Sequence, residues 1–489
     1  MSGGGSDALW TAAEAAAATG GRVDGDWAAT SVSIDTRSLA PGALFVALKG
    51  DARDGHGFVG DALEKGAAAA LVSHPPDGFA APGRLLMVGD TLEGLRGLAA
   101  AARARLAPEA RVIGVTGSVG KTGVKEMLRA MLSAQAATHA PEGSFNNHWG
   151  VPLTLARSPR DARFLVIEMG MNHAGEIAPL SRLARPEVAL ITTVTAAHIG
   201  NFADEAGVAD AKAEIFEGVA AGGVAVLNRD NRWFDRLAGA ARAHGLEIVS
   251  FGEGEGCDAR LVSAQLRGPA TVVEARVGGL DLVFKIGAPG RHLALNAVGA
   301  LAAAQAAGAD LARAALALAA WRAPEGRGAR WRVHVGPDGD GVIELIDESY
   351  NANPASVGAA LEVLAAAPVE DGVGRIARGR RIACLGDMME LGEQETALHA
   401  GIADHPALGE VDLVFTVGER MRALHAALPK AQAGGWFPDS RAAADRLKRM
   451  LDAGDVLMVK GSKTVQMGAV VRAVKALGQA RDASAPEET

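Results

Sequence analysis

The residues best suited to chemistry form a glycine-rich stretch, Thr116-Gly-Ser-Val-Gly-Lys-Thr122. It stands between an apolar run typical of a buried strand (111–116) and an amphipathic run typical of a helix (124–134). In such a turn the backbone N–H groups of Gly117, Ser118, Val119 and Gly120 face phosphate oxygens. Lys121 then reaches the β- and γ-phosphates, and the Thr122 hydroxyl binds Mg²⁺. The sequence therefore predicts a phosphate loop that binds a nucleoside triphosphate.

One position departs from the general phosphate-loop pattern. That pattern requires glycine where this chain has Val115. The alternative interpretation is an ordinary glycine-rich turn between a strand and a helix. The loop alone also does not separate an enzyme from a nucleotide-dependent switch protein.

Three further side chains are candidates for the same site. Glu168 ends the apolar run Phe164–Ile167, and His198 follows the apolar run Val188–Thr193. The carboxyl ends of parallel strands gather ligands at one edge of a sheet, and a carboxylate there suits Mg²⁺. Lys212 lies in a predicted helix among acidic residues, where its spacing alone favours a solvated surface position.

These residues require a parallel sheet to bring them together. Apolar runs alternate with helical patterns from residue 111 to residue 246, which predicts a doubly wound, mostly parallel sheet. Shorter alternating runs in 247–287 predict an antiparallel flank. Strand-like runs recur after the Gly- and Pro-rich segment Ala323–Arg330, as in a second nucleotide-binding fold. The tail from about Ala480 is polar and is expected to be disordered.

The length and composition fit three soluble domains. With 489 residues and roughly 150 residues per domain, we expect an α/β protein with domains at 1–108, 109–328 and 329–489. The net charge of −8 and the lack of a basic cluster argue against nucleic acid as a partner. Cys257 and Cys384 are too few for a disulfide framework.

Polar residues interrupt the longest apolar stretch, Leu293–Trp321, which indicates a buried helix rather than a membrane span. No signal peptide is recognisable, and a monomer is expected.

In order and spacing, the motifs resemble those of the Mur ligases, and the resemblance covers nearly the whole chain. The family also shares the departure at Val115. Within the family, the last domain resembles the branch that adds D-alanyl-D-alanine, and no Asp-Asn-Pro-Arg motif of the diaminopimelate-adding branch is present. The segments that carry the resemblance are Asp35–Gly50, Thr116–Thr122, Asn146–Asn147, Gly150–Thr154, Glu168–Gly170, His198, Ala211–Ile215, Gly326–Arg327, Asp347–Pro354, Leu385–Gly392 and Lys460–Ser462.

The resemblance implies a cytoplasmic, ATP-dependent ligase of cell-wall precursor synthesis. ATP would phosphorylate the carboxylate of UDP-N-acetylmuramoyl tripeptide, and the amine of D-alanyl-D-alanine would attack the acyl phosphate. Two Mg²⁺ ions are implied, the first held by Thr122 and Glu168 and the second by Glu168, His198 and Lys212. Lys212 would carry a carbamate formed from CO₂, and Lys121 would complete the catalytic set.

The resemblance also implies binding roles. Asn296, Arg327, Asp347 and Asn351 match positions that contact ATP, although Asn296 and Asn351 would also suit caps of helices or turns. The first domain would bind the UDP part of the precursor through Ser31, Asp35, Thr36 and Arg37, although Arg37 would equally suit a structural ion pair. Asn146 and Asn147 would bind the muramoyl substrate or a phosphate.

Three alternatives remain at this point. The first is a Mur ligase that adds diaminopimelate or lysine. The second resembles folylpolyglutamate synthase, which shares the loop and the lysine but does not need the Asp35–Arg37 region. The third is a phosphate-loop switch protein, in which Lys212 would be dispensable. The sequence does not decide whether the third residue of the tripeptide is diaminopimelate or lysine.

Overall fold

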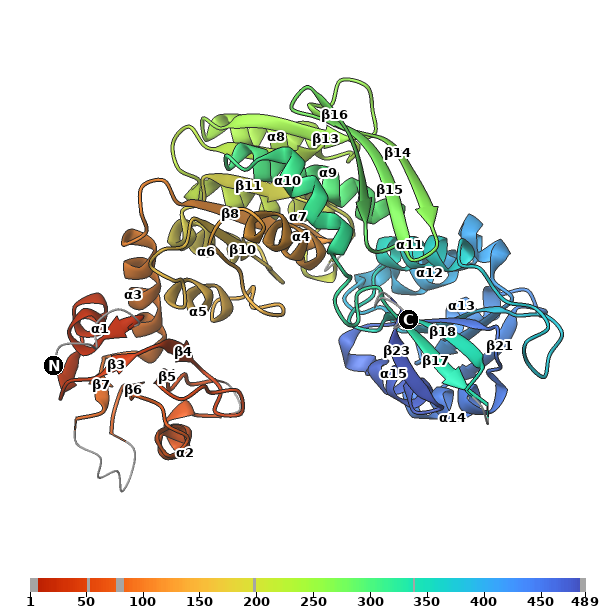
Figure 1. Ribbon diagram of the computed structural model, residues 1–489, viewed down its shortest axis with the longest axis horizontal. Helices are drawn as coiled ribbons and strands as arrows, with labels where there is room; N and C mark the ends of the chain where they lie inside the picture. The colour runs from red at the N-terminus through yellow and green to blue at the C-terminus, as the bar shows by residue number, and fades with distance from the viewer. Residues whose placement is uncertain (1–7, 51–52, 76–82, 197–198, 337–338, 484–489) are drawn as a thin grey trace.

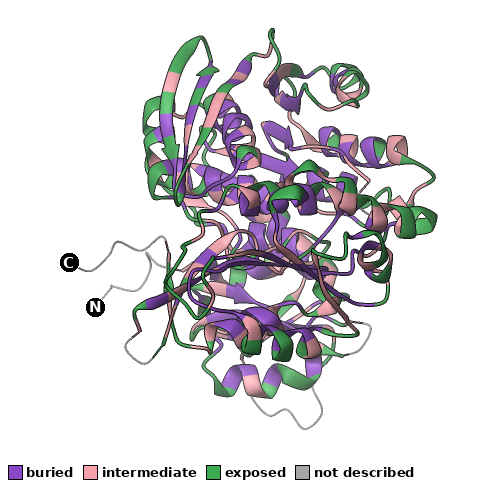
Figure 2. Ribbon diagram, turned by 90° about the vertical axis from the view of Figure 1, so that its right-hand side faces the viewer, coloured by how far each residue is buried: buried purple, intermediate pink, exposed green. Residues whose placement is uncertain are grey.

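The computed structural model describes residues 8–50, 53–75, 83–196, 199–336 and 339–483. Three large sheets follow one another along the chain, each with its own helices (Figure 1). This arrangement confirms the predicted α/β fold with an N-terminal, a central and a C-terminal domain. Buried residues lie along the sheets and on the inner faces of the helices, and exposed residues lie on the outer faces (Figure 2).

The N-terminal domain is built on a five-stranded sheet in the order β2-β7-β6-β5-β4, in which only the β2–β7 pair is antiparallel. Its first helix begins with a capping box between Thr11 and Glu14. The elements are β1 (Trp10–Thr11), α1 (Ala12–Thr19), β2 (Arg22–Asp24), β3 (Ala28–Ala29), β4 (Ser31–Ser33), β5 (Ala43–Val46), η1 (Gly55–Phe58), α2 (Val59–Glu64), β6 (Ala69–Val72), β7 (Leu85–Met87) and α3 (Thr91–Ala104).

The central domain contains a nine-stranded sheet in the order β16-β15-β14-β13-β12-β11-β8-β10-β9. The strands from β9 to β14 pair in parallel, and β14, β15 and β16 form the predicted antiparallel flank. The elements are β8 (Arg111–Thr116), α4 (Lys121–Ser133), β9 (Thr138–His139), α5 (Gly150–Ala156), β10 (Phe164–Glu168), α6 (Ile177–Ala184), β11 (Val188–Ile191), η2 (Ile199–Asn201), α7 (Glu205–Ala213), η3 (Glu214–Gly218), β12 (Val224–Asn228), α8 (Phe234–Ala243), β13 (Glu247–Gly252), β14 (Ala259–Arg267), β15 (Ala270–Val277), β16 (Leu280–Ile286), α9 (Arg291–Ala306), α10 (Leu311–Ala317) and η4 (Leu318–Ala320).

The C-terminal domain contains a seven-stranded sheet in the order β21-β20-β19-β22-β18-β17-β23, parallel from β21 to β18. The elements are β17 (Ala329–Val335), β18 (Gly341–Glu348), α11 (Pro354–Ala365), β19 (Arg381–Gly386), η5 (Gly392–Gln394), α12 (Glu395–Ala400), η6 (Gly401–Asp404), η7 (Pro406–Glu410), β20 (Leu413–Val417), α13 (Arg422–Ala427), β21 (Ala433–Phe437), α14 (Ser440–Met450), β22 (Val456–Lys460), η8 (Lys463–Val465), α15 (Gly468–Lys475) and β23 (Gln479–Asp482).

Two sequence expectations need correction. The tail was expected to be disordered from about Ala480, but 479–482 form β23, an edge strand antiparallel to β17. Main-chain hydrogen bonds hold such a strand, so its polar composition gave no signal. The expected buried helix over Leu293–Trp321 is divided into α9, α10 and η4.

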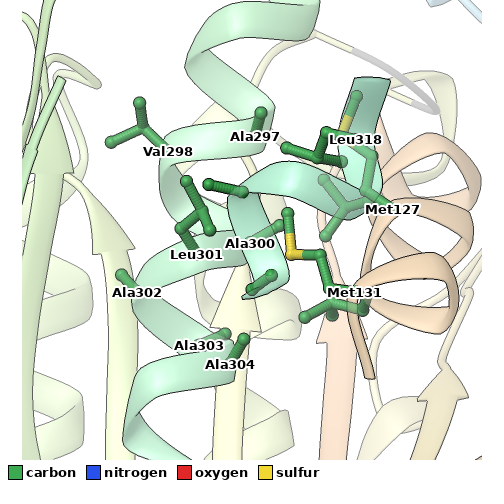
Figure 3. Close-up of a cluster of buried hydrophobic side chains, with 14 of the residues drawn as sticks. Met127, Met131, Ala297, Val298, Ala300, Leu301, Ala302, Ala303, Ala304 and Leu318 are labelled. Carbon is green, nitrogen blue, oxygen red and sulfur yellow. The ribbon is translucent and has the colours of Figure 1, made fainter. Parts of the chain in front are cut away.

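The core of the central domain fixes the helix that follows the phosphate loop. Met127 and Met131 of α4 pack against the small side chains Ala297 and Ala300 of α9 (Figure 3). All four side chains are fully buried. Because alanine lets helices approach closely, this contact packs the middle of α9 against the second half of α4.

Candidate active site

The phosphate loop occupies the switch point of the central sheet. From β8 the chain runs through α4 to β9 and β10 on one side and then crosses to β11 on the other side. Ligands of doubly wound sheets bind at the carboxyl end of the strands at such a point. The loop follows β8 there and leads directly into α4, as the sequence predicted.

Two glycines give the loop its shape. Gly117 has φ 145° and Gly120 has φ 86°, which are conformations that favour glycine. A Cβ on Gly117 would lie 2.0 Å from Oγ1 of Thr192, and one on Gly120 would lie 2.9 Å from Nδ2 of Asn296. The Lys121 ammonium donates to the carbonyl oxygen of Gly117 at 2.6 Å. The loop therefore curls around its own lysine, and Asn296 lies against it.

The segment after β11 holds the other side of the loop. The Ser118 N–H donates to the carbonyl oxygen of Thr193 at 2.8 Å, and the Ser118 hydroxyl donates to that of Thr195 at 3.1 Å. Thr192 donates to the carbonyl oxygen of Val119. His198 lies three residues beyond Thr195 and is outside the described residues, so its predicted role stays a prediction.

Glu168 lies beside the loop with one oxygen unpaired. Its side chain is 1% exposed at the end of β10. Oε1 accepts hydrogen bonds from Oγ1 of Thr122 at 3.2 Å and from Nδ2 of Asn146 at 2.7 Å. Oε2 is buried without a hydrogen-bond partner. A buried, unpaired carboxylate oxygen is costly, and a cation beside a hydroxyl ligand would satisfy it. The residues therefore fit a divalent ion such as Mg²⁺.

Lys212 is buried, contrary to the solvated position that its spacing alone favoured. Its side chain is 1% exposed near the end of α7. Burial, together with the charge of Lys121, lowers the pKa of Lys212 well below 10.5, and Glu214 and Glu176 only partly oppose this. Burial also lowers the pKa of Lys121, whereas Glu168 raises it. The structure thus brings Lys212 close to the phosphate-loop lysine, and its ammonium is disfavoured relative to that of an exposed lysine.

The segment that links the central and C-terminal domains also lies near the phosphate loop. Nη2 of Arg327 donates to Oγ of Ser144 at 3.0 Å. The guanidinium lies 4.0 Å from the ring centroid of Tyr350 and is close enough to lower the pKa of Lys121 electrostatically. Arg327 is therefore held between the two domains with its charge directed toward the phosphate loop.

Asp347 and Asn351, also predicted to contact ATP, make local hydrogen bonds in the structure. Oδ2 of Asp347 accepts from the Gly326 N–H at 3.1 Å, and Oδ1 accepts from the Ser349 hydroxyl at 2.6 Å. Asn351 is exposed, and its carbonyl oxygen accepts from the buried Lys460 ammonium at 3.0 Å. These contacts form the turn that leads from β18 to α11, at the junction of the two domains.

The predicted residues of the N-terminal domain lie apart from the phosphate loop. Arg37 pairs with Asp35 at 2.6 Å and lowers the Asp35 pKa to about 2, while the Arg37 side chain remains 87% exposed. Ser31 lies in β4, and the backbone oxygen of Thr36 accepts from Lys65 at 3.2 Å. Asp35 and Arg37 therefore form a local ion pair, which is one of the two roles that the sequence allowed for Arg37.

Asn147 stands at the start of α5. Its Oδ1 accepts from the Gly150 N–H at 2.9 Å and from the Trp149 N–H at 3.2 Å, while its side chain remains exposed. Asn146, its neighbour, faces Glu168 instead. The pair thus connects the loop before α5 to the carboxylate site.

One buried residue that supports the site was not predicted from the sequence. Lys125 of α4 is fully buried, and its ammonium donates to the carbonyl oxygens of Pro141 at 2.7 Å and Gly143 at 2.9 Å. It therefore holds the loop that carries Ser144 and Asn146. The sequence did carry a sign of this burial. Lys125 stands three and seven residues before the apolar Leu128 and Leu132, which places all three on one face of the helix.

The fold and the site together define a phosphate-loop α/β protein with a carboxylate and a buried lysine beside the nucleotide position. Three family models match the chain: the Mur ligase family catalytic domain over residues 28–103, the Mur ligase middle domain over 115–304 and the Mur ligase glutamate ligase domain over 330–463. The chain belongs to the Mur ligase family. Among the described residues, no helix is long and apolar enough to cross a membrane.

Individual relatives match nearly end to end. The UDP-N-acetylmuramoyl-tripeptide–D-alanyl-D-alanine ligase of Escherichia coli (strain K12) is 37% identical over 92% of this chain and 94% of that protein. The ligase of the same name from Bacillus subtilis (strain 168) is 32% identical over 90% of this chain and 92% of that protein. The crystal structure of MurF from Acinetobacter baumannii has a TM-score of 0.79 and 29% identity over 96% of this chain and 99% of that one.

Proposed function

We propose that this chain uses ATP to join D-alanyl-D-alanine to UDP-N-acetylmuramoyl tripeptide, releasing ADP and phosphate. The observation that carries the proposal is the buried Glu168 carboxylate, held by Thr122 and Asn146 beside the phosphate loop with one oxygen unpaired. The near end-to-end similarity to D-alanyl-D-alanine ligases supports this substrate pair. The reaction belongs in the cytoplasm, where ATP and UDP-linked precursors are available.

The chemistry must bring two anions together. A carboxylate of the tripeptide has to attack the γ-phosphorus of ATP, and both groups are negatively charged. Mg²⁺, bound by Thr122 and Glu168, would supply charge that offsets this repulsion. The Lys121 ammonium and the Arg327 guanidinium add positive charge from the protein itself. The bond from the γ-phosphorus to the bridging oxygen breaks, ADP leaves, and an acyl phosphate forms.

The second half-reaction makes the amide. The neutral amine of D-alanyl-D-alanine attacks the acyl carbon, the tetrahedral intermediate collapses, and orthophosphate leaves. The phosphate-loop N–H groups and Lys121 continue to bind the departing phosphate. Because water competes with the amine, the site must exclude water, and Arg327 stacked on Tyr350 would help to shield it on the side of the C-terminal domain.

Lys212 would act as a carbamate. As an ammonium 4 Å from a divalent ion it would be repelled by roughly 8 kcal/mol at an effective dielectric constant of 20. Its lowered pKa favours the neutral amine, which can attack CO₂ and form an anionic carbamate. That anion, with Glu168 and His198, would hold a second Mg²⁺.

Each of the three domains would bind one of the substrates. The N-terminal domain would bind the UDP part of the precursor, the central domain ATP, and the C-terminal domain D-alanyl-D-alanine. Asn296 beside Gly120 would contact the nucleotide, and Asp347 and Asn351 would shape its site from the far side. We propose domain boundaries near residues 108 and 328 and a monomeric enzyme.

The test is to combine ATP, Mg²⁺, UDP-N-acetylmuramoyl tripeptide and D-alanyl-D-alanine and to follow the release of orthophosphate. Release should require both the tripeptide and the dipeptide. A Mur ligase that adds diaminopimelate or lysine would instead turn over with that amino acid and a precursor that lacks the third residue, and a folylpolyglutamate-synthase-like ligase would not use the UDP-linked precursor. Phosphate release without any acceptor amine would indicate a switch protein, and release of AMP with pyrophosphate would exclude the acyl-phosphate route.

A further inference from the structure

A main-chain hydrogen bond joins the central domain to the C-terminal domain at η2. The Gly200 N–H donates to the carbonyl oxygen of Glu390 at 3.0 Å. Glu390 belongs to segment 387–392, which follows β19 and ends at the first residue of η5. A Cβ on Gly200 would lie 3.2 Å from the Gly392 nitrogen, and one on Gly392 would lie 3.2 Å from Cα of Gly200. The two segments therefore meet backbone to backbone, and two glycines make the close approach possible.

The chain on both sides of Gly200 is tied to the central domain. The Thr195 carbonyl oxygen accepts the Ser118 hydroxyl of the phosphate loop at 3.1 Å, and the Thr195 N–H donates to the same hydroxyl oxygen at 3.0 Å. The Asn201 side-chain amide donates to the carbonyl oxygen of Asn172 at 3.2 Å. Asn172 lies in the chain that follows β10, beside the phosphate loop. The contact with the C-terminal domain is thus made by a segment that also braces the phosphate loop.

Segment 387–392 is fixed by hydrogen bonds within the C-terminal domain. The Met388 N–H donates to Nε2 of the buried His399 at 3.0 Å, and the Met389 N–H donates to Oγ of Ser462 at 3.0 Å. Glu390 has φ 63°, in the left-handed region that residues other than glycine seldom adopt. Such a conformation persists only where the surrounding structure holds it. The segment therefore presents the Glu390 carbonyl oxygen to the central domain from a fixed position.

The contact contributes little to the stability of the fold. Gly200, Glu390 and Gly392 are all exposed, and one hydrogen bond that water can replace adds little free energy of folding. The contact is thus too small to hold the domains together. Its place beside the phosphate loop nevertheless lets it set where the C-terminal domain stands relative to that loop.

The reaction depends on that position, so this inference rests on the proposed function. The acyl phosphate would form at the phosphate loop of the central domain, whereas the C-terminal domain would bring the amine of D-alanyl-D-alanine. We infer that Gly200 and segment 387–392 form a positioning contact, which places the amine close enough to the acyl carbon to react before water does. Gly200 touches no reacting atom and acts through the position of the other domain. A misplacement of about 1 Å can lower such a rate about 100-fold.

The experiment compares the orthophosphate released with the amide formed. The positioned amine gives one amide for each orthophosphate, whereas water that attacks the acyl phosphate releases orthophosphate and returns the free tripeptide. Both products are measured with ATP, Mg²⁺, UDP-N-acetylmuramoyl tripeptide and D-alanyl-D-alanine for the wild type, Gly200→Ala and Gly200→Val. The three atoms nearest to a Cβ at position 200 all belong to Glu390 and Gly392, so these side chains strain the contact itself.

Gly409→Val is the matched control. Like Gly200, Gly409 is exposed in a 3₁₀ helix, but nothing lies within 4 Å of its Cβ position. Gly392 is less suitable for substitution, because its φ of 63° disfavours any side chain whatever the space around it.

The wild type and Gly409→Val should form one amide for each orthophosphate. Gly200→Val should release about twice as much orthophosphate as amide and raise the KM for D-alanyl-D-alanine about tenfold, while the KM for ATP stays within about threefold. Gly200→Ala should lie between the wild type and Gly200→Val in both quantities.

The results that would overturn the inference can be told apart from failure of the ligase proposal. If Gly200→Val keeps one amide for each orthophosphate and an unchanged KM for the dipeptide, the contact has no positioning role, even if the variant melts at a lower temperature. An equal excess of orthophosphate from Gly409→Val would overturn the inference as well. Both results leave the ligase proposal intact, whereas a wild type without acceptor-dependent phosphate release would refute that proposal and the positioning contact with it.

Discussion

The Asn146 side-chain amide donates a 2.7 Å hydrogen bond to Oε1 of Glu168 and so joins the loop before α5 to the end of β10. This bond, with that from Thr122, occupies one carboxylate oxygen and leaves the other buried and unpaired. A protein rarely keeps such an oxygen without a ligand. The unpaired oxygen therefore lowers stability and supports the ion site that we propose next to the phosphate loop.

Glu168→Gln tests whether the charge of this carboxylate binds Mg²⁺ and costs stability. The amide keeps the size of the side chain but removes the charge that would bind Mg²⁺. We expect acceptor-dependent phosphate release to fall by at least about 100-fold, while the thermal midpoint stays equal or rises because the buried charge is gone. Calorimetric titration with Mg²⁺ and ATP should show weaker binding. A variant with near-normal turnover at ordinary Mg²⁺ concentrations would contradict the assignment.

Lys212→Met tests the cost of the buried amine. Because the folded-state pKa lies below the ordinary value of 10.5, the folded protein binds fewer protons than the unfolded chain. Lys212 therefore lowers stability at neutral pH, and the loss shrinks as the pH rises toward 10.5. The methionine variant should melt at a higher temperature at pH 7, with a smaller gain at pH 10, while turnover falls by at least about 100-fold. A lower melting temperature with normal turnover would show that Lys212 is structural.

Removal of CO₂ tests the carbamate. Enzyme kept in CO₂-free buffer should lose most of its turnover, and added bicarbonate should restore it. The requirement should become stronger as the pH falls, since protonation of Lys212 removes the nucleophilic amine. Lys212→Met provides the control, because its residual activity should not respond to bicarbonate. Turnover that is independent of CO₂ in the wild type would remove the carbamate from the mechanism.

Gly120→Ala tests the shape of the phosphate loop. Its φ of 86° disfavours alanine, and the new Cβ would lie 2.9 Å from Asn296. We expect ATP affinity to fall by more than about tenfold, with a stability loss of about 1–2 kcal/mol. Gly123→Ala is the matched control, because nothing lies within 4 Å of its Cβ position in α4. It should leave ATP binding unchanged and stabilise the protein by about 0.5–1 kcal/mol. Equal ATP affinities in the two variants would contradict this account of the loop.

The sequence was informative wherever a local pattern reports on structure. The apolar strand, the glycines and the following amphipathic helix predicted the phosphate loop, because they lie within one short stretch. The contact between Asn146 and Glu168 had no such signal, since it depends on how the loop before α5 meets the end of β10. The bond from Arg327 to Ser144 spans 183 residues and depends on the position of a whole domain. The local sequence predicted an exposed position for Lys212, because a lysine among acidic residues in a helix is typical of the surface.

The central claim is that the tripeptide carboxylate itself takes up the γ-phosphoryl group. A tripeptide labelled with ¹⁸O in its terminal carboxylate, incubated with ATP, Mg²⁺ and D-alanyl-D-alanine in ordinary water, tests it directly by mass spectrometry of the orthophosphate. An acyl phosphate predicts that one ¹⁸O atom appears in each phosphate released with a new amide bond. Orthophosphate without ¹⁸O, formed at the same rate as the amide, would contradict the account.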